Sequence, residues 1–108
     1  MVEPHPADVT ITIPGGVVEA LAAAYAAYKE ALESASSRRP RRTSGRVALW
    51  RALAAAEDDL GQALKQTAVH IQLRLVRDAV FRDGTRFVHD ARRRRAEAAE
   101  IEREAPDA

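Results

Sequence analysis

The 108-residue sequence contains no cysteine, and this absence excludes several kinds of protein at once. Without a thiol there can be no disulfide framework, no cysteine nucleophile and no cysteine-ligated zinc site. The three histidines, His5, His70 and His89, have no His, Asp or Glu four residues away, the spacing that helical zinc sites use. We therefore expect no metal, no cofactor and no enzymatic activity.

Long apolar runs are also missing. No stretch approaches the about 20 apolar residues that a membrane-spanning helix needs. The first residues show no basic segment followed by an apolar one, as a secretory signal would. We therefore expect a cytoplasmic protein without membrane contact, and at this length a single domain at most.

Aromatic residues are few and alanines are many. The sequence has one Trp, two Tyr and two Phe against twenty-three Ala. Alanine is the strongest helix former, but it buries little apolar surface per residue. The composition therefore predicts an all-α protein whose helices form readily and need close packing, or a second copy of the chain, to stay together.

Apolar residues at helical spacing predict three helices. The first covers residues 15–35, a long central helix covers 45–82, and a third covers about 86–104. The Asp83-Gly84-Thr85 sequence is typical of a helix end followed by a new helix start. The predicted fold is a helical hairpin or bundle around one long central helix.

The predicted helices lie between two segments of different character. The alternating sequence Val9-Thr10-Ile11-Thr12-Ile13 indicates a short extended segment within a flexible N-terminus, residues 1–14. The helical domain at 15–91 includes a basic linker at 36–44, and a charged helical tail follows at 92–108. Beyond residue 95 the only large apolar side chain is Ile101. We therefore expect the tail to be frayed until a partner orders it.

Residues 69–75 fit two secondary structures. The residues before and after this segment have apolar side chains at helical spacing, which favours a helix here as well. Strict alternation of apolar and polar residues is typical of a strand, which would pair with 9–13 in a small sheet.

As a helix, residues 69–81 would carry apolar side chains on two adjoining faces. One neighbouring helix cannot cover so wide an arc, and the third predicted helix has few apolar residues with which to fold back over it. This pattern favours self-association, as a homodimer, over coverage by the same chain. The predicted interface residues are Val69, Ile71, Leu73, Leu75, Val76 and Val80.

The linker suggests an alternative function. Residues 37–56 contain six Arg and no acidic residue, although the net charge of the whole chain is only +1. Guanidinium groups on a flexible loop bind phosphates, which would make the chain a nucleic-acid-binding regulator. A solvated linker without a partner explains the same residues. The predicted phosphate contacts are Arg38, Arg39, Arg41 and Arg42.

Two segments resemble ribbon-helix-helix DNA-binding proteins. Thr10-Ile-Thr-Ile-Pro-Gly-Gly-Val-Val-Glu-Ala-Leu is similar to their opening strand, proline and first helix, and Ser44-Gly-Arg-Val-Ala-Leu-Trp-Arg-Ala-Leu resembles the start of their second helix. The resemblance implies that two copies pair their strands and place Asp8, Thr10 and Thr12 in the DNA major groove. It covers about a third of the chain, and the first predicted helix and the linker are both longer than in that family.

Overall fold

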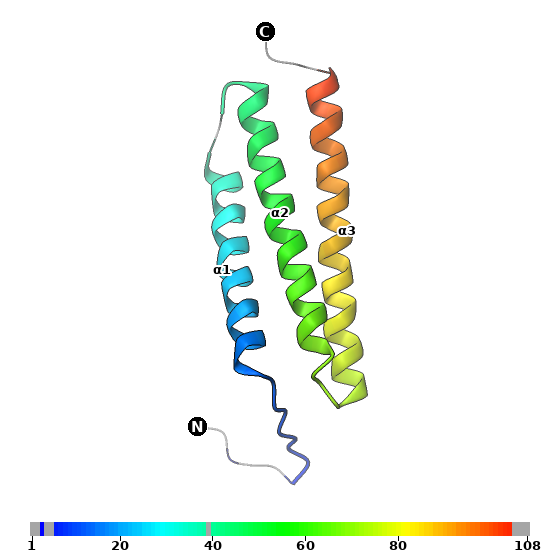
Figure 1. The fold of residues 1–108 in the computed structure, drawn as a ribbon. Helices are drawn as coiled ribbons and strands as arrows, with labels where there is room; N and C mark the ends of the chain where they lie inside the picture. The colour runs from blue at the N-terminus through cyan, green and yellow to red at the C-terminus, as the bar shows by residue number, and fades with distance from the viewer. Residues whose placement is uncertain (1–2, 4–5, 39, 105–108) are drawn as a thin grey trace.

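The computed structural model describes residues 3, 6–38 and 40–104, and in this part of the chain it contains three helices and no strand. They are α1 (Gly15–Ser37), α2 (Thr43–Ala68) and α3 (Arg74–Glu104). Figure 1 shows the helices side by side and alternating in direction, with α2 between the other two. The prediction of an all-α helical bundle is confirmed.

Local chemistry sets both ends of α1. The carbonyl of Pro14 accepts hydrogen bonds from the amides of Val17 and Val18 at 3.0 and 3.2 Å, so the first turn forms directly after the proline. At the other end the hydroxyls of Ser36 and Ser37 each donate to the carbonyl four residues earlier, at 2.8 Å. Serine side chains that bond the backbone in this way weaken a helix, and α1 ends there.

The predicted long helix over 45–82 is wrong, because the chain reverses direction at residues 69–73. The amide of His70 donates to the Thr67 carbonyl at 3.1 Å and that of Ile71 to the Ala68 carbonyl at 3.0 Å, which tightens the end of α2. Residues 69–73 include no glycine or proline and no positive φ. Ile71, only 5% exposed, is buried in the turn and fixes it to the bundle.

The predicted break at residues 83–85 is also wrong. These residues lie inside α3, which runs without interruption to Glu104. Residues 96–104 therefore continue α3 instead of fraying, and Ala98, like Ala91 before it, is fully buried. This last part of α3 packs on α2 because small residues let the two helices approach closely.

The buried core belongs to α2 and α3. Its apolar members are Val47, Leu53, Ala54, Ala56, Leu60 and Ala68 from α2, Ile71 from the turn, and Val88, Ala91 and Ala98 from α3. In contrast, no residue of α1 is buried, although the helix is 23 residues long and packs along α2. The α2–α3 hairpin is therefore the stable part of the bundle, and α1 is held to it more loosely.

Candidate interaction surfaces

An apolar groove, which we call the α1–α3 groove, runs between α1 and α3 over the surface of α2. Its volume is about 520 Å³. Tyr25 and Val18 of α1 are 54% and 49% exposed, so water reaches apolar surface that a helix of a closed bundle would bury. The lining residues are Val18, Leu21, Ala22, Tyr25 and Tyr28 of α1, Leu60 and Leu64 of α2, and Phe87 of α3.

Within the groove one aromatic pair joins α1 directly to α3. The rings of Tyr28 and Phe87 meet edge to face, with centroids 5.4 Å apart and an angle of 79° between the planes. Such a pair contributes about 0.5–1.5 kcal/mol beyond the area that it buries. It positions α1 relative to α3 while leaving the neighbouring Tyr25 in contact with solvent.

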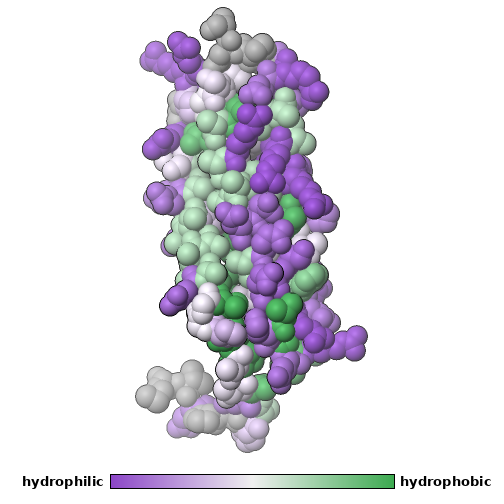
Figure 2. Space-filling view, viewed as in Figure 1, coloured by the Kyte–Doolittle hydropathy of each residue, from purple (hydrophilic) through white to green (hydrophobic). Residues whose placement is uncertain are grey.

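A second apolar surface lies at the turn between α2 and α3. Four exposed apolar residues make up this surface, which we call the end surface. They are Val69 (65% exposed), Leu73 (41%), Leu75 (82%) and Val76 (38%). Figure 2 shows strongly hydrophobic side chains gathering at this lower end of the bundle. Isolated exposed apolar residues are ordinary, but four within eight residues are a concentration typical of interaction surfaces.

The sequence-predicted interface is only partly available. Its exposed members are those of the end surface, whereas Val80 is half-buried and Ile71 is covered by its own chain. Ile71 is therefore not on the surface of the single chain, and the role of the other residues in an interface stays a prediction. The physical reason is the turn at 69–73: without a continuous helix there, the two adjoining apolar stripes do not form on one element.

The N-terminal extended segment lies against this same turn. Residues 9–12 line a small cavity of about 170 Å³ together with His70, Gln72 and Leu73. The strand interpretation of 69–75 was therefore wrong about secondary structure, since neither segment is a strand. It was right that the two segments lie together. Thr10 and Thr12, to which the family resemblance gives a role in DNA binding, are exposed beside the turn.

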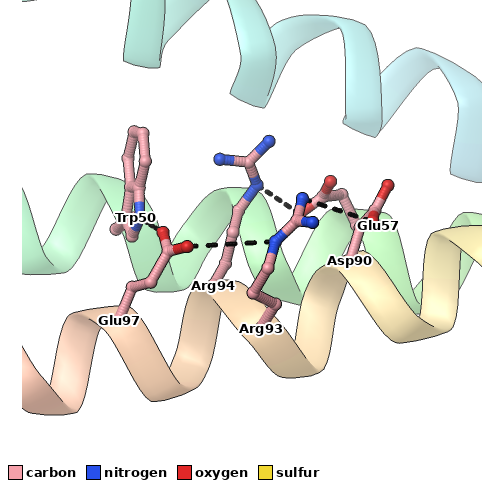
Figure 3. Close-up of polar contacts among 6 residues, drawn as sticks. All are labelled: Trp50, Glu57, Asp90, Arg93, Arg94 and Glu97. Carbon is pink, nitrogen blue, oxygen red and sulfur yellow. Dashed lines mark hydrogen bonds and ion pairs between the residues drawn. The ribbon is translucent and has the colours of Figure 1, made fainter.

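A buried ion pair links α2 to α3. The Glu57 side chain is 3% exposed, and the Arg94 Nε lies 2.6 Å from its Oε1 atom. The Arg94 guanidinium also lies over the Trp50 ring, 4.9 Å from its centroid. Figure 3 shows these side chains meeting between the two helices. Burial of a charge is tolerated when a partner of opposite charge and further polar contacts replace water.

Neighbouring polar contacts extend this cluster along the hairpin. The indole N–H of Trp50 donates to Glu97 at 3.2 Å, and Arg93 lies within 3.8 Å of the same carboxylate. The i,i+4 pair Arg93–Glu97 was foreseeable from sequence spacing. The Arg94–Glu57 pair was not, since 37 residues separate its members and only the α2–α3 turn brings them together.

Further ion pairs, more exposed to solvent, also join α2 to α3. Arg51 makes two hydrogen bonds to the Glu102 carboxylate, at 3.0 and 3.3 Å, and Arg95 lies 3.4 Å from Asp58. Exposed pairs contribute about 0–1 kcal/mol each. Their role is therefore to fix how α3 is aligned along α2 rather than to supply most of the stability.

The basic linker lies at the end of the bundle opposite the α2–α3 turn (Figure 1). Arg38, Arg41 and Arg42 are exposed, and the predicted contact Arg39 lies outside the described residues. The acidic end of α3 lies at this end as well. A hydrogen bond to Glu100 and the charge of that residue raise the pKa of Glu104 above its ordinary value. Nearby acidic groups weaken the attraction of the linker for phosphates.

Within the described residues, no group of three or more His, Asp or Glu side chains could hold a metal ion. No helix there combines the length and apolar character needed to cross a membrane. Comparisons with protein-family models, curated proteins and solved structures give no match for this chain.

Proposed function

We propose that this chain is a non-enzymatic helical interaction protein that self-associates as a homodimer through the α1–α3 groove. The observation that supports this most directly is that α1 buries no residue although it carries a row of large apolar side chains. Most helical stability in proteins comes from packing an apolar face, and a helix that buries no residue lacks much of that packing. A second copy laid along the groove would supply that packing.

The shape of the bundle favours its side over its end as the main contact. The chain measures 64 × 26 × 22 Å. A specific dimer buries about 800 Å² on each partner. An end face of 26 by 22 Å is smaller than this, whereas the long side is larger. The end surface would then provide additional apolar contacts and would not form the whole dimer interface.

The chemistry of the groove fits a second copy of the same helix. Its lining is apolar and aromatic apart from the two tyrosine hydroxyls, which suits the Ala- and Tyr-rich face of another α1. A two-fold dimer places the same patch on both partners, so Tyr25 of one copy would pack near Tyr25 of the other. Aromatic residues at the centre of a patch are typical anchors of protein interfaces.

Sedimentation velocity at micromolar concentration tests the proposal. We expect the wild-type protein to sediment as a dimer and Tyr25→Glu as a monomer with unchanged helical circular dichroism, because Tyr25 is half-exposed in the single chain. Ala23→Glu, an exposed position of α1 outside the groove lining, is the matched control and should remain dimeric. A wild-type monomer that unfolds cooperatively would overturn the proposal.

The same experiment distinguishes the two apolar surfaces. Leu75→Glu changes the most exposed residue of the end surface, at 82% exposure, without touching the groove. We expect this variant to stay dimeric. Dissociation by Leu75→Glu and not by Tyr25→Glu would place the interface at the end surface, as the sequence alone predicted.

Nucleic-acid binding is a second candidate. It is favoured by the exposure of Arg38, Arg41 and Arg42 on one short connection. Phosphate contacts of this kind give an affinity that falls steeply with salt concentration. The acidic end of α3 at the same end of the bundle opposes it, so we place it behind self-association.

A further inference from the structure

A cavity separate from the α1–α3 groove lies where the linker, the start of α2 and the end of α3 meet. Its volume is about 310 Å³, at the lower end of the range of small-molecule sites. Leu49, Trp50 and Ile101 provide apolar walls, and Arg38, Pro40 and Arg46 line it from the linker and the first turn of α2. The cavity therefore combines apolar walls with two arginine residues.

Arg38 and Arg46 give this cavity its positive charge. In the described part of the chain, Arg51, Arg93, Arg94 and Arg95 each lie beside a carboxylate. In contrast, no carboxylate of the described residues lies within ion-pair distance of Arg38 or Arg46. The side-chain contact of Arg46 is with the Thr43 hydroxyl, at 3.4 Å. The cavity is thus left with positive charge that nothing in the described parts of α2 or α3 neutralises.

Two carboxylates of α3 at this end of the bundle are already engaged by other side chains. Glu97 accepts a hydrogen bond from the Trp50 indole, and Glu102 is bound by Arg51. Arginine presents a planar, always charged fork that matches a carboxylate, sulfonate or phosphate group. An anion from outside the chain is therefore the complementary partner for the two cavity arginines.

One wall of the cavity depends on a glycine. A Cβ on Gly45 would lie 2.8 Å from the Cβ of Pro40, too close for an unshifted proline. Since Gly45 has no side chain, the proline ring can rest on the first turn of α2 and form the wall next to Arg46. An alanine at this position would move the linker and open the cavity.

We propose that this cavity binds an amphiphilic organic anion, a compact negative group joined to an apolar body. The anionic group would lie between Arg38 and Arg46, and the apolar body would contact Leu49, Trp50 and Ile101. This binding site goes beyond self-association and uses none of the residues that line the α1–α3 groove. It therefore stands or falls independently of the dimer.

Trp50 makes the site directly observable, because it is the only tryptophan in the chain. We would titrate the full-length protein with decanoate, and with decanol and decyltrimethylammonium at the same chain length, all below their micelle concentrations. We expect a saturable change in tryptophan emission with decanoate, binding at least tenfold weaker with decanol, and none with the cation. Equal affinity for decanoate and decanol would overturn the proposal, since the charge would then play no part.

Two double variants distinguish binding in this cavity from unspecific attraction of anions to the positive charge of the linker. Replacing Arg38 and Arg46 together by Ala should weaken decanoate binding at least tenfold while leaving the circular dichroism unchanged. The matched control replaces Arg41 and Arg42, which removes the same charge from the same region at positions that do not line the cavity. Equal weakening in both double variants would refute a specific site. Gly45→Ala should also weaken binding.

A further titration identifies the source of the anion. A short peptide ending in leucine, with a free or an amidated C-terminus, presents the same chemistry as a protein segment. Tighter binding of the free-carboxylate peptide than of decanoate would point to a protein C-terminus, and the reverse order to a free organic acid. Binding of the amidated peptide as tightly as the free one would contradict the proposed role of the carboxylate.

Discussion

Gly61 of α2 and Gly84 of α3 lie in direct backbone contact where the two helices pack together. A Cβ on Gly61 would lie 2.7 Å from the Gly84 carbonyl oxygen, and a Cβ on Gly84 would lie 2.7 Å from the carbonyl oxygen of Gly61. Neither residue has a positive φ, so each is needed for space and not for an unusual backbone conformation. This approach brings the Glu57–Arg94 and Asp58–Arg95 pairs into range.

The first prediction is that Gly61→Ala destabilises the protein. Judged on helix propensity alone, the substitution should stabilise α2 by up to about 1 kcal/mol. In the bundle the new methyl group would meet backbone and the Val88 side chain at 2.8 Å or less, so the helices must separate. Overpacking of this kind costs about 1–3 kcal/mol. We expect a lower midpoint in urea unfolding.

Gly16→Ala is the matched control for this prediction. Gly16 also lies in a helix, and a Cβ there would have no neighbour within 4 Å. The substitution should leave stability unchanged or raise it by about 0.5–1 kcal/mol. If Gly61→Ala were as harmless as Gly16→Ala, the close approach of α2 and α3 would not exist in solution.

Much of the helical content could be predicted from sequence, because apolar spacing and alanine content are local signals. The turn at 69–73 could not. The stripe through Leu60, Leu64, Ala68 and Ile71 continues in helical register across the true end of α2. Burial of Ile71 and the glycine contact determine where the chain reverses, and both depend on residues distant in sequence. Gly84 resembled a stop signal for the same reason: its partner, Gly61, could not be identified from the sequence.

The candidate surfaces were predicted less well than the fold. The exposure of Val69 and Leu75 could be predicted because the segment has more apolar residues than one neighbouring helix can cover. The continuous helix on which this prediction placed them was wrong. The α1–α3 groove was missed because Tyr25 and Tyr28 fit the ordinary pattern of a core-facing helix. Only the packing of α1 shows that this face stays open.

A second prediction concerns the end of α3. Deleting residues 96–108 removes the fully buried Ala98 together with the contacts of Glu97 to Trp50 and of Glu102 to Arg51. We expect the melting temperature to fall on the order of 10 °C, the equivalent of roughly 2 kcal/mol for a domain of this size. Hydrogen exchange should show protected amides across 97–102 in the full chain. An unchanged melting temperature would indicate that this segment frays, as the sequence suggested.

A third prediction tests the basic linker against duplex DNA. Replacing Arg38, Arg41 and Arg42 by Ser removes three exposed charges. If the linker binds phosphate, affinity should fall and the slope of log affinity against log salt should decrease by about 0.9 for each phosphate that the variant no longer neutralises. The control variant replaces three arginines near the start of α3, far from the linker, and so removes the same amount of positive charge. These are Arg74, Arg77 and Arg82. Equal effects of the two triple variants would exclude a specific role for the linker.

The final prediction concerns the buried ion pair. Arg94→Met keeps the length and apolar stem of the side chain but leaves the Glu57 carboxylate, 3% exposed, without its partner. Removing one member of a buried pair costs about 3–5 kcal/mol, because the remaining charge then has neither water nor its counter-ion. Arg93→Met is the neighbouring control; its ion pairs are largely exposed, so it should cost about 1 kcal/mol or less. Adding Glu57→Leu to Arg94→Met removes the unpaired buried charge and should restore most of the stability.

Urea unfolding of the wild type, the two single variants and the double variant measures these free-energy differences. If the double variant were no more stable than Arg94→Met, the contact of the Arg94 cation with the Trp50 ring, rather than the ion pair, would supply the stability.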